Sequence, residues 1–514
     1  MVTSTVVADS STAMDMLELV RALACELDRR KVRYCHWKSN ASLHEAVLGV
    51  GDLDLLVDPT HLSEFEAALA SLGFVEVVTL DGPSAQGTRH FVGLDDPTSR
   101  LVHLDVYTRL LTGGTLLKNH HLPLEDLLFE SVHRDSPLPV PSRAAELVLL
   151  VIRKSIESGS VLEHALLQRE YERVRLELDW LGVDGATRVE AQALVACWLP
   201  MLDLVLFDRC LVALRNPRSV LERWLLGRQL QRVLRAYEVL PAWRARLERL
   251  RRLKRRMFGR LGLTPRRFRL RSGGAIIAFL GPEASGKSTL VEQTTAWLSE
   301  VFDVHQIRSG TPPASVLTAL PNLLLPLLRA ALPAYRTSSL ETSSLSHIAR
   351  KRSAGLWLYL LRCVAIGDDR RRLLSRAARF KREGAIVISD RYPTMYRGFV
   401  DSRQLDELSL AAAGHAPAAW LARLESRLYA SVPPADLVLT CYLPMAEMLK
   451  RNAERDKVGG PEPEDYVRRR HVLFLERLPE EFCRNILDTT EPLEQTLRKV
   501  RRLIWHALVM RSAA

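Results

Sequence analysis

Paired cysteines and long apolar runs are both missing from this chain of 514 residues. Its seven cysteines form no C-x-x-C pair and no even-numbered framework, so the sequence indicates neither a zinc site of that kind nor a disulfide scaffold. The apolar runs at 323–332 and 356–366 are broken by proline or arginine well short of the ~20 residues that a bilayer span needs. A secretory signal pattern is also missing. We therefore expect a cytoplasmic protein with no transmembrane segment.

The composition is that of a globular chain with an excess of positive charge. Hydrophobic residues make up 47% and charged residues 26%, and at roughly 100–200 residues per domain the chain should hold two or three domains. The formal net charge of +12 favours anionic partners, which include nucleotides, nucleic acid and membrane surfaces. Arginines that only face water would give the same number, so the net charge does not choose among these partners.

Residues 275–289, AIIAFLGPEASGKST, combine an apolar run with a glycine-rich turn. The turn fits the spacing G-x-x-x-x-G-K-[ST], in which backbone N–H groups surround phosphates, the lysine reaches the transferring ones and the serine hydroxyl binds Mg²⁺. The apolar run predicts a buried parallel strand, and residues 290–298 predict the helix that must follow. We expect this nucleotide-binding loop to consist of Gly281, Pro282, Glu283, Ala284, Ser285, Gly286, Lys287, Ser288 and Thr289.

Alternating carboxylates mark the N-terminal part of the chain, where we expect helices at 12–30 and 43–48 and strands at 32–37, 52–58 and 101–106. Strand alternation places Asp52 and Asp54 on one face, and the strand at 101–106 could bring Asp105 beside them. Three such carboxylates suit Mg²⁺ bound to a nucleoside triphosphate. The alternative is that Asp52 and Asp54 only cap and solubilise an edge strand.

Over residues of about 30–110 this pattern resembles the nucleotidyltransferase superfamily. The resemblance implies a second nucleotide and metal site in the N-terminal part. Lys38-Ser39-Asn40 stands where the superfamily has a Gly-Ser turn that holds triphosphate. The resemblance therefore implies nucleotide binding more directly than nucleotidyl transfer.

The middle of the chain is helical and rich in leucine and arginine, with helices expected at 142–156, 162–181 and 188–214. Its end, residues 244–271, interleaves arginines with leucines at roughly the spacing of an amphipathic basic helix. Such a segment could contact nucleic acid or lipid, and the plainer alternative is a linker helix that faces water.

Further strands are expected after the nucleotide-binding loop, at 303–307, 385–389 and 436–442, and helices at 369–382 and 446–455. Asp390-Arg391-Tyr392 directly follows the strand at 385–389, and ligands bind at such carboxyl ends of parallel strands. Arg451 and Arg455 lie four residues apart, so they share one face of their helix.

In their order along residues of about 273–510, these motifs resemble the thymidylate kinase family of P-loop nucleoside monophosphate kinases. Arg308 matches the family's arginine after the second strand, Asp369-Arg370 its Asp-Arg before the third, and Arg451 and Arg455 its lid arginines. The resemblance implies Mg²⁺ binding by Ser288 and Asp390. It implies catalytic roles for Lys287, Asp390, Arg451 and Arg455, and contact with the acceptor for Glu283, Arg308, Arg370, Arg391 and Tyr392.

We therefore expect an α/β protein with a nucleotidyltransferase-like domain (1–135), a helical basic connector (136–271) and a P-loop kinase domain with a parallel sheet (272–514). The expected activity is transfer of the γ-phosphoryl group of ATP, with Mg²⁺, to a nucleoside monophosphate or related acceptor. Residues after Arg308 and Tyr392 differ from the family's pattern, so a sugar or sugar-phosphate kinase of surface polysaccharide metabolism is an alternative. An RNA-end-processing kinase and nucleotidyltransferase and an inactive nucleotide-sensing scaffold are two others. Relatives of this kind often form homodimers.

Overall fold

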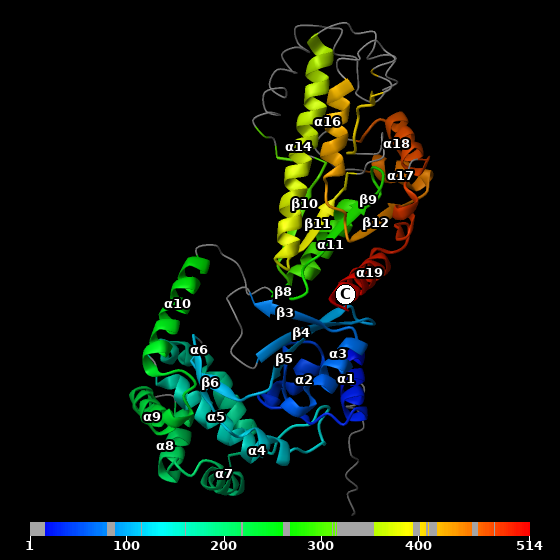
Figure 1. Ribbon diagram of the computed structural model, residues 1–514. Helices are drawn as coiled ribbons and strands as arrows, with labels where there is room; N and C mark the ends of the chain where they lie inside the picture. The colour runs from blue at the N-terminus through cyan, green and yellow to red at the C-terminus, as the bar shows by residue number, and fades with distance from the viewer. Residues whose placement is uncertain are drawn as a thin grey trace, which may run out of the picture. The chain divides into compact units, whose positions relative to one another are not determined.

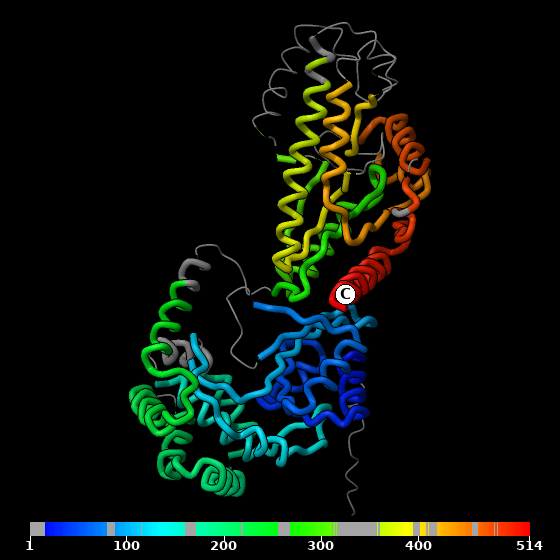
Figure 2. The backbone as a smooth tube through the Cα atoms, in the orientation of Figure 1, coloured from blue at the N-terminus to red at the C-terminus, as the bar shows by residue number. Residues whose placement is uncertain are grey.

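The chain folds into two compact units, Met1–Phe268 (unit 1) and Arg269–Ser512 (unit 2), whose elements are labelled in Figure 1 and whose backbone can be followed in Figure 2. In this computed structural model, the residues described are 16–79, 88–114, 116–159, 161–183, 185–216, 219–260, 268–310, 312–313, 315, 354–393, 401–407, 410, 419–454, 461–476 and 478–513. The chain passes from unit 1 to unit 2 within strand β8 (Phe268–Leu270).

Unit 1 begins with a mixed sheet in which β2 and β5 run parallel and the other pairs run antiparallel. One face of these strands supplies apolar side chains such as Leu53, Leu55 and Leu104 to a core shared with α1 and α3. In order across the sheet the strands are β1 (Tyr34–His36), β2 (Asp52–Val57), β5 (Arg100–Tyr107), β4 (Thr88–Asp95) and β3 (Val75–Thr79), and the helices of this part are α1 (Glu18–Arg29), α2 (Leu43–Val47) and α3 (Leu62–Ser71).

The helical part of unit 1 packs around α5 (Arg143–Ser158), whose residues are buried on nearly every side. Its core also includes Cys35, Trp37, Leu56 and Tyr107 from the sheet. The boundary that the sequence suggests near residue 135 therefore lies inside one shared core. The remaining elements are the hairpin β6 (Leu111–Gly113) and β7 (Lys118–His121), and the helices α4 (Glu125–Glu130), α6 (Val161–Trp180), α7 (Gly185–Trp198), α8 (Leu204–Arg215), α9 (Val220–Val233) and α10 (Ala242–Arg260).

Two sequence expectations in this part need correction. The single helix expected at 188–214 is two helices, α7 and α8, because Pro200 lies between them and Asp203 caps α8 by accepting a hydrogen bond from the Val205 N–H. The basic helix expected at 244–271 ends at Arg260, and residues 268–270 form a strand.

Unit 2 contains a five-stranded sheet in which all neighbouring strands run parallel. The chain forms β10 and β11 on one side of β9 and then β12 and β13 on the other side, so the carboxyl end of β9 lies at a topological switch point. All five residues of β9 are buried, as expected for a strand covered on both faces. In order across the sheet the strands are β10 (Val304–Arg308), β11 (Ile386–Asp390), β9 (Ile276–Leu280), β12 (Leu437–Tyr442) and β13 (Ile486–Asp488).

Helices surround this sheet, and the long α14 packs beside α16 (Figure 1). Strand β9 leads into α11, and β12 leads into α17, so the loops that follow these strands lie at the carboxyl edge of the sheet. The helices of unit 2 are α11 (Lys287–Ser299), α14 (Ala354–Arg382), α16 (Ala419–Ala430), α17 (Met445–Ala453), α18 (Glu464–Glu476) and α19 (Leu493–Ala513).

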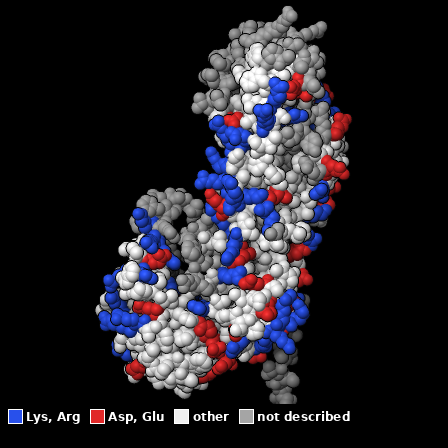
Figure 3. All heavy atoms as spheres, in the orientation of Figure 1, with Lys and Arg blue, Asp and Glu red and all other residues white. Residues whose placement is uncertain are grey.

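Basic side chains gather over α9 and α10 on the face of unit 1 drawn in Figure 3, as the arginine-rich sequence of α10 requires. Exposed apolar residues, including Trp243, Leu247 and Leu250, alternate with them. In the described part of the chain, no helix is long and apolar enough to cross a membrane.

Candidate functional site

The glycine-rich loop joins β9 to α11 at the carboxyl edge of the parallel sheet. Gly281 has φ +154°, and a Cβ there would lie 2.7 Å from the Ser285 Oγ and 2.8 Å from the Cys441 carbonyl oxygen, so only glycine fits. Gly286 (φ +81°) is the residue from which α11 begins. The first N–H groups of a helix have no partner inside it, so this loop and the start of α11 present the kind of N–H groups that bind anions in proteins.

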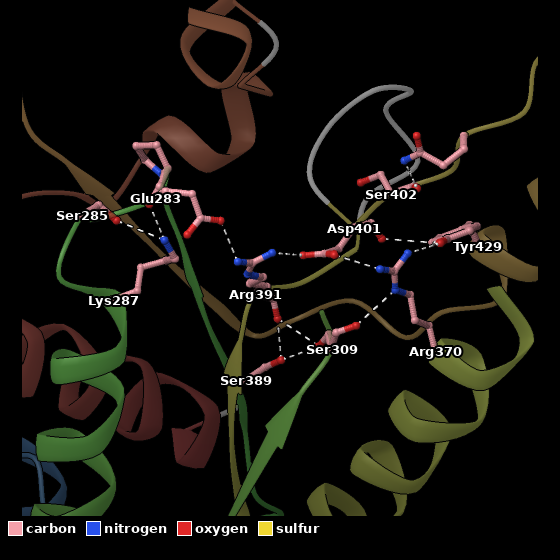
Figure 4. Close-up of polar contacts among 12 residues, drawn as sticks. Glu283, Ser285, Lys287, Ser309, Arg370, Ser389, Arg391, Asp401, Ser402 and Tyr429 are labelled. Atoms are coloured by element: carbon pink, nitrogen blue, oxygen red, sulfur yellow. Dashed lines mark hydrogen bonds and ion pairs between the residues drawn. The ribbon is translucent and has the colours of Figure 1, made fainter. Parts of the chain in front are cut away.

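Lys287 is the first residue of α11 and folds back over the loop (Figure 4). Its side chain is buried, and the Nζ donates hydrogen bonds to the Pro282 carbonyl and to the Ser285 Oγ at 3.2 Å. Burial lowers the pKa of Lys287, although the carboxylates of Glu283 and Asp390 oppose that change. Within the part of the chain that the structure describes, Lys287 is therefore a buried cation held by neutral oxygens alone, and a phosphate would be a better partner.

Asp390 ends β11, the strand beside β9, with Phe279 as its register partner. Its Oδ1 is buried and has no hydrogen-bond partner among the described residues. Arg391 follows in the left-handed region with φ +74°, and Ala284 in the loop has φ +59°. Such conformations are uncommon for residues with a Cβ and are found most often at functional sites.

A row of alternating charges starts at the loop and runs across the carboxyl edge (Figure 4). Arg391 donates to Glu283 at 2.9 Å and to Asp401 at 3.2 Å, and Arg370 donates to Asp401 at 2.8 Å. Burial acts to lower the pKa of Arg391, but the charges of Asp401 and Glu283 outweigh it and the pKa is raised. The row holds the Arg391 guanidinium next to the glycine-rich loop.

Arg370, on α14, has its guanidinium fully engaged by protein groups. Besides Asp401, it donates to the Ser309 carbonyl at 3.1 Å and to the Tyr429 hydroxyl at 2.7 Å, and it is 7% exposed. The Ser309 and Ser389 hydroxyls lie 2.7 Å apart, and both donate to the Arg391 carbonyl. Arg370 therefore positions the end of β10 and Asp401, and through Asp401 it positions Arg391.

Two residues expected at the acceptor do not join this row. Arg308, at the end of β10, is exposed. Tyr392 is buried in the core of unit 2, and its hydroxyl donates to the Pro433 carbonyl, so this hydroxyl already has a partner.

Of the two expected lid arginines, Arg451 lies beside the glycine-rich loop and Arg455 lies outside the described residues. A Cβ placed on Gly286 would be 4.0 Å from the Arg451 Nη1. The guanidinium is held there by Glu447, at 3.0 Å from its Nε, and by the Thr489 carbonyl, at 2.9 Å from its Nη2. Arg451 therefore adds positive charge on the β13 side of the loop.

Sequence reasoning missed Asp401, Ser309, Ser389 and Tyr429 in this site. None of them belongs to a motif of fixed spacing, and they come together only because α14, α16 and the ends of β10 and β11 meet.

In unit 1 the register places Asp54 beside Asp105 and Asp52 beside His103, as strand alternation suggested. The three carboxylates nevertheless do not converge on one point. Asp54 forms an ion pair with Lys38 at 2.7 Å, and Asp52 lies 2.7 Å from the His103 Nδ1. Asp54 is neutralised by Lys38, and Asp52 has its own hydrogen-bond partner in His103, so these two carboxylates do not need the shared Mg²⁺ that the sequence suggested.

Asp105 also contacts a histidine of the neighbouring strand β4, a partner that the sequence did not suggest. The His90 Nδ1 lies 2.6 Å from its Oδ1. Burial acts to raise the pKa of Asp105, but the hydrogen bond from His90 and the charges of His103, His90 and Lys38 outweigh it and lower the pKa to about 2.

Next to these carboxylates lies a group of cations over aromatic rings. The Lys38 Nζ and the Lys118 Nζ lie 4.8 Å and 5.3 Å from the centre of the Tyr107 ring, and the Arg153 Cζ lies 5.3 Å from the Trp37 ring. Within the described part of unit 1, neither Lys118 nor Arg153 forms an ion pair with a carboxylate. Burial, together with the charges of Lys38 and Arg153, lowers the pKa of Lys118 to about 8.

Comparison with known proteins adds little to this geometry. The chain matches no family model and no curated protein. Among solved structures, thymidylate kinase from Candida albicans is similar to it with 19% sequence identity and a TM-score of 0.27, over 45% of this chain and 91% of that one. Values this low carry no argument about activity. The structure by itself shows a mixed α/β protein whose unit 2 has a parallel sheet with a glycine-rich loop at its carboxyl edge.

Proposed function

We propose that unit 2 is a phosphotransferase that moves the γ-phosphoryl group of ATP to a nucleoside monophosphate or a related acceptor. The observation that carries this proposal is the group of residues at the carboxyl edge of β9 and β11. There the glycine-rich loop leads into α11, and the buried Lys287 is the first residue of that helix. Asp390, at the end of β11, has a buried oxygen without a hydrogen-bond partner in the described residues.

Phosphoryl transfer needs positioning and charge neutralisation more than covalent help from the protein. The acceptor oxygen forms a bond to the γ-phosphorus while the bond from that phosphorus to the β–γ bridging oxygen breaks, and ADP leaves with the electron pair. Lys287 and the free N–H groups of α11 would bind the β- and γ-phosphates. Arg451, on the β13 side of the loop, would neutralise the negative charge of the phosphates.

The residues present also fit Mg²⁺. The buried Asp390 Oδ1 has no partner in the described residues, and Ser288 is exposed on the first turn of α11. These oxygens are ligands of the kind that Mg²⁺ prefers. When bound, Mg²⁺ would neutralise phosphate charge, and Ser288 and Asp390 are the residues that would hold it.

For the acceptor, Arg391 is the residue best placed to bind a phosphate. Its side chain is 29% exposed and bridges Glu283 and Asp401 beside the loop, and a guanidinium can bind a phosphate through two parallel hydrogen bonds. Glu283 resembles the family's acid that meets an acceptor sugar hydroxyl, and its place beside Arg391 suits that role. Arg308, exposed on the neighbouring strand, remains a proposed contact of a larger acceptor.

The test is an acceptor screen with labelled ATP and the full-length chain, covering nucleoside monophosphates, sugars, sugar phosphates and RNA ends. Transfer to a nucleoside monophosphate supports the proposal. Transfer only to a sugar or sugar phosphate would favour a role in surface polysaccharide metabolism, and salt-dependent RNA retention would favour RNA-end processing. ATP binding without any acceptor that accelerates ADP release would indicate a nucleotide-sensing scaffold.

We also propose that unit 1 binds a nucleotide. The observation in favour is the group of three half-buried cations, Lys38, Lys118 and Arg153. Among the described residues of unit 1, Lys118 and Arg153 have no carboxylate partner, and such cations suit phosphates.

This second site can be counted in the Lys287→Ala variant, whose loop in unit 2 should bind nucleotide weakly. We expect that variant to retain one equivalent of labelled nucleoside triphosphate, and the added change Lys118→Ala to remove it. Lys254→Ala, at an exposed lysine of α10, is the matched control. Retention of the full equivalent after Lys118→Ala would exclude this cation group as the site.

A further inference from the structure

Two histidines and one aspartate converge on the polar face of the sheet in unit 1. His90 on β4 is the register partner of Asp105 on β5, and His103 lies two residues before Asp105 on the same strand face. One ligand atom from each of the three residues lies within 4.8 Å of the other two. In the described part of the chain, this is the one group of histidine, cysteine and acidic side chains that meets so closely.

The spacing of these atoms is close to that of a tetrahedral metal site. With bonds of about 2.0–2.1 Å, two ligand atoms on one Zn²⁺ lie about 3.3 Å apart. The His103 Nε2 is 3.4 Å from the Asp105 Oδ1, which already fits. The His90 Nδ1 is 2.6 Å from the same oxygen, so it must move by less than about 1 Å to make room for an ion.

Asp52 orients His103 in the way that metal-binding histidines usually require. The His103 Nδ1 lies 2.7 Å from the Asp52 Oδ1, which leaves the Nε2 as the atom directed at Asp105. That Nε2 is buried and has no hydrogen-bond partner within the described residues. Histidine ligands of metals almost always donate their other ring N–H to a carboxylate or carbonyl, so Asp52 has the place of a supporting residue.

Ring packing fixes the two imidazoles further. The His90 and His103 rings are stacked with centroids 5.6 Å apart, and the Phe268 ring lies 4.7 Å from His103 and 5.3 Å from His90. A rigid arrangement lowers the conformational cost of binding an ion.

We propose that His90, His103 and Asp105 bind a transition metal ion of the Zn²⁺ class, with Asp52 positioning His103 and a fourth coordination position open to water or a ligand. Imidazole nitrogens favour Zn²⁺ and its neighbours, whereas Mg²⁺ prefers oxygen ligands alone. This site requires neither the kinase activity nor the nucleotide proposed for unit 1.

The site is connected to the neighbouring cations through the other oxygen of Asp105. The Tyr107 hydroxyl lies 3.4 Å from the Asp105 Oδ2, and the Lys38 Nζ donates to that hydroxyl at 3.0 Å. Because Lys38 adds positive charge on this side of Asp105, phosphate-bearing anions are the class of ligand that we propose for the open position.

Titration of the metal-free, full-length protein with Co²⁺, followed by visible absorption, tests the proposal. We expect one equivalent to give the intense bands of a four-coordinate ion and Zn²⁺ to displace it. His90→Gln and His103→Gln should each weaken binding at least about 100-fold, and Asp52→Asn about 10- to 100-fold. His44→Gln, at an exposed histidine of α2, should leave binding unchanged.

Equal Co²⁺ affinity in the wild type and both histidine variants would overturn the proposal, as would a wild type that binds no Co²⁺. Displacement of Co²⁺ by an equal concentration of Mg²⁺ would overturn the assignment to the Zn²⁺ class. If His103→Gln does not fold, as judged by circular dichroism, the decision rests on Asp52→Asn. This change should not disturb folding, because the Asp52 side chain is 56% exposed.

Discussion

At the carboxyl edge of unit 2, the cationic side chains differ in whether a carboxylate of the protein is bonded to them. This difference decides which of them can bind a negatively charged ligand. Among the described residues, Lys287 is bonded only to neutral oxygens, whereas Arg370 is bonded to Asp401 and is 7% exposed. Buried cations of the first kind bind ligands readily, and those of the second kind hold a structure in place. The two residues therefore have different roles although both were expected in the site.

Replacement of Lys287 by alanine should abolish phosphoryl transfer and leave the fold intact. The change removes the charge that lies where negative charge concentrates in the reaction, and the side chain makes no ion pair that the fold would lose. Steady-state ADP release with the best acceptor is the measurement. Lys499→Ala, at an exposed lysine paired with Glu491, is the control and should keep wild-type turnover. Wild-type turnover in Lys287→Ala would remove the loop from the mechanism.

Glu146, on α5, gives unit 1 a dependence on pH. It is 2% exposed and accepts hydrogen bonds from the Asn40 N–H at 3.2 Å and the Asn40 Nδ2 at 2.8 Å, and burial raises its pKa to about 7. The folded state therefore holds this proton more tightly than the unfolded state. Its contribution to stability is present at low pH and is lost as pH rises through the interval between the two pKa values.

We expect the wild type to lose up to about 3 kcal/mol of unfolding free energy relative to Glu146→Gln between about pH 4.5 and pH 7. The amide of glutamine has the same shape and does not ionise, so the difference isolates this one group. Chemical denaturation of both proteins at several pH values measures it. A difference that stays constant with pH would show that Glu146 does not ionise in this interval.

At the scale of elements, α17 ends next to the glycine-rich loop and so places the charge of Arg451 there. Arg451 is in the last turn of α17 and is tied to Glu447 one turn earlier and to the chain after β13. This arrangement lets one helix deliver a guanidinium to a loop that itself contains no arginine.

Arg451→Ala should lower kcat by about 10³-fold and change ATP affinity less, if its charge acts mainly in the transition state. Initial rates over a range of ATP concentrations separate the two effects. Arg468→Ala is a matched control, because Arg468 forms the same kind of i,i+4 pair, with Glu464, on the exposed face of α18. An unchanged kcat in Arg451→Ala would assign catalysis to other cations, with Arg455 as the first to test.

At the scale of the whole molecule, the chain has two compact units with separate cores. Nucleotide binding to one of them should stabilise that unit by mass action and leave the melting temperature of the other unit unchanged. This separation gives a test of the proposed site that does not require an acceptor.

A nonhydrolysable ATP analogue with Mg²⁺, at about 100 times its Kd, should raise the melting temperature of unit 2 by roughly 5–10 °C. Differential scanning calorimetry of the full-length chain measures the shift. In Lys287→Ala the same ligand concentration should give a much smaller shift. An equal shift in the variant would show that the nucleotide binds elsewhere.

The sequence by itself determined the local features of this protein. The positions of β9, β11, α5 and α11 were predicted to within a few residues, because an apolar run, a glycine turn and helical spacing are all encoded by neighbours in the chain. Alternation along β2 likewise placed Asp52 and Asp54 on one face.

Only the tertiary structure decided which charges meet. Asp401 reaches Arg370 and Arg391, and His90 reaches Asp105, because separate elements pack together, and no spacing in the sequence encodes those distances. The same is true of Lys38, whose ion pair with Asp54 gives one of the carboxylates that the sequence grouped around Mg²⁺ a partner within the protein. Side chains far apart in the chain become partners through the fold, and the partner decides whether a charge is a structural tie or remains available to a ligand.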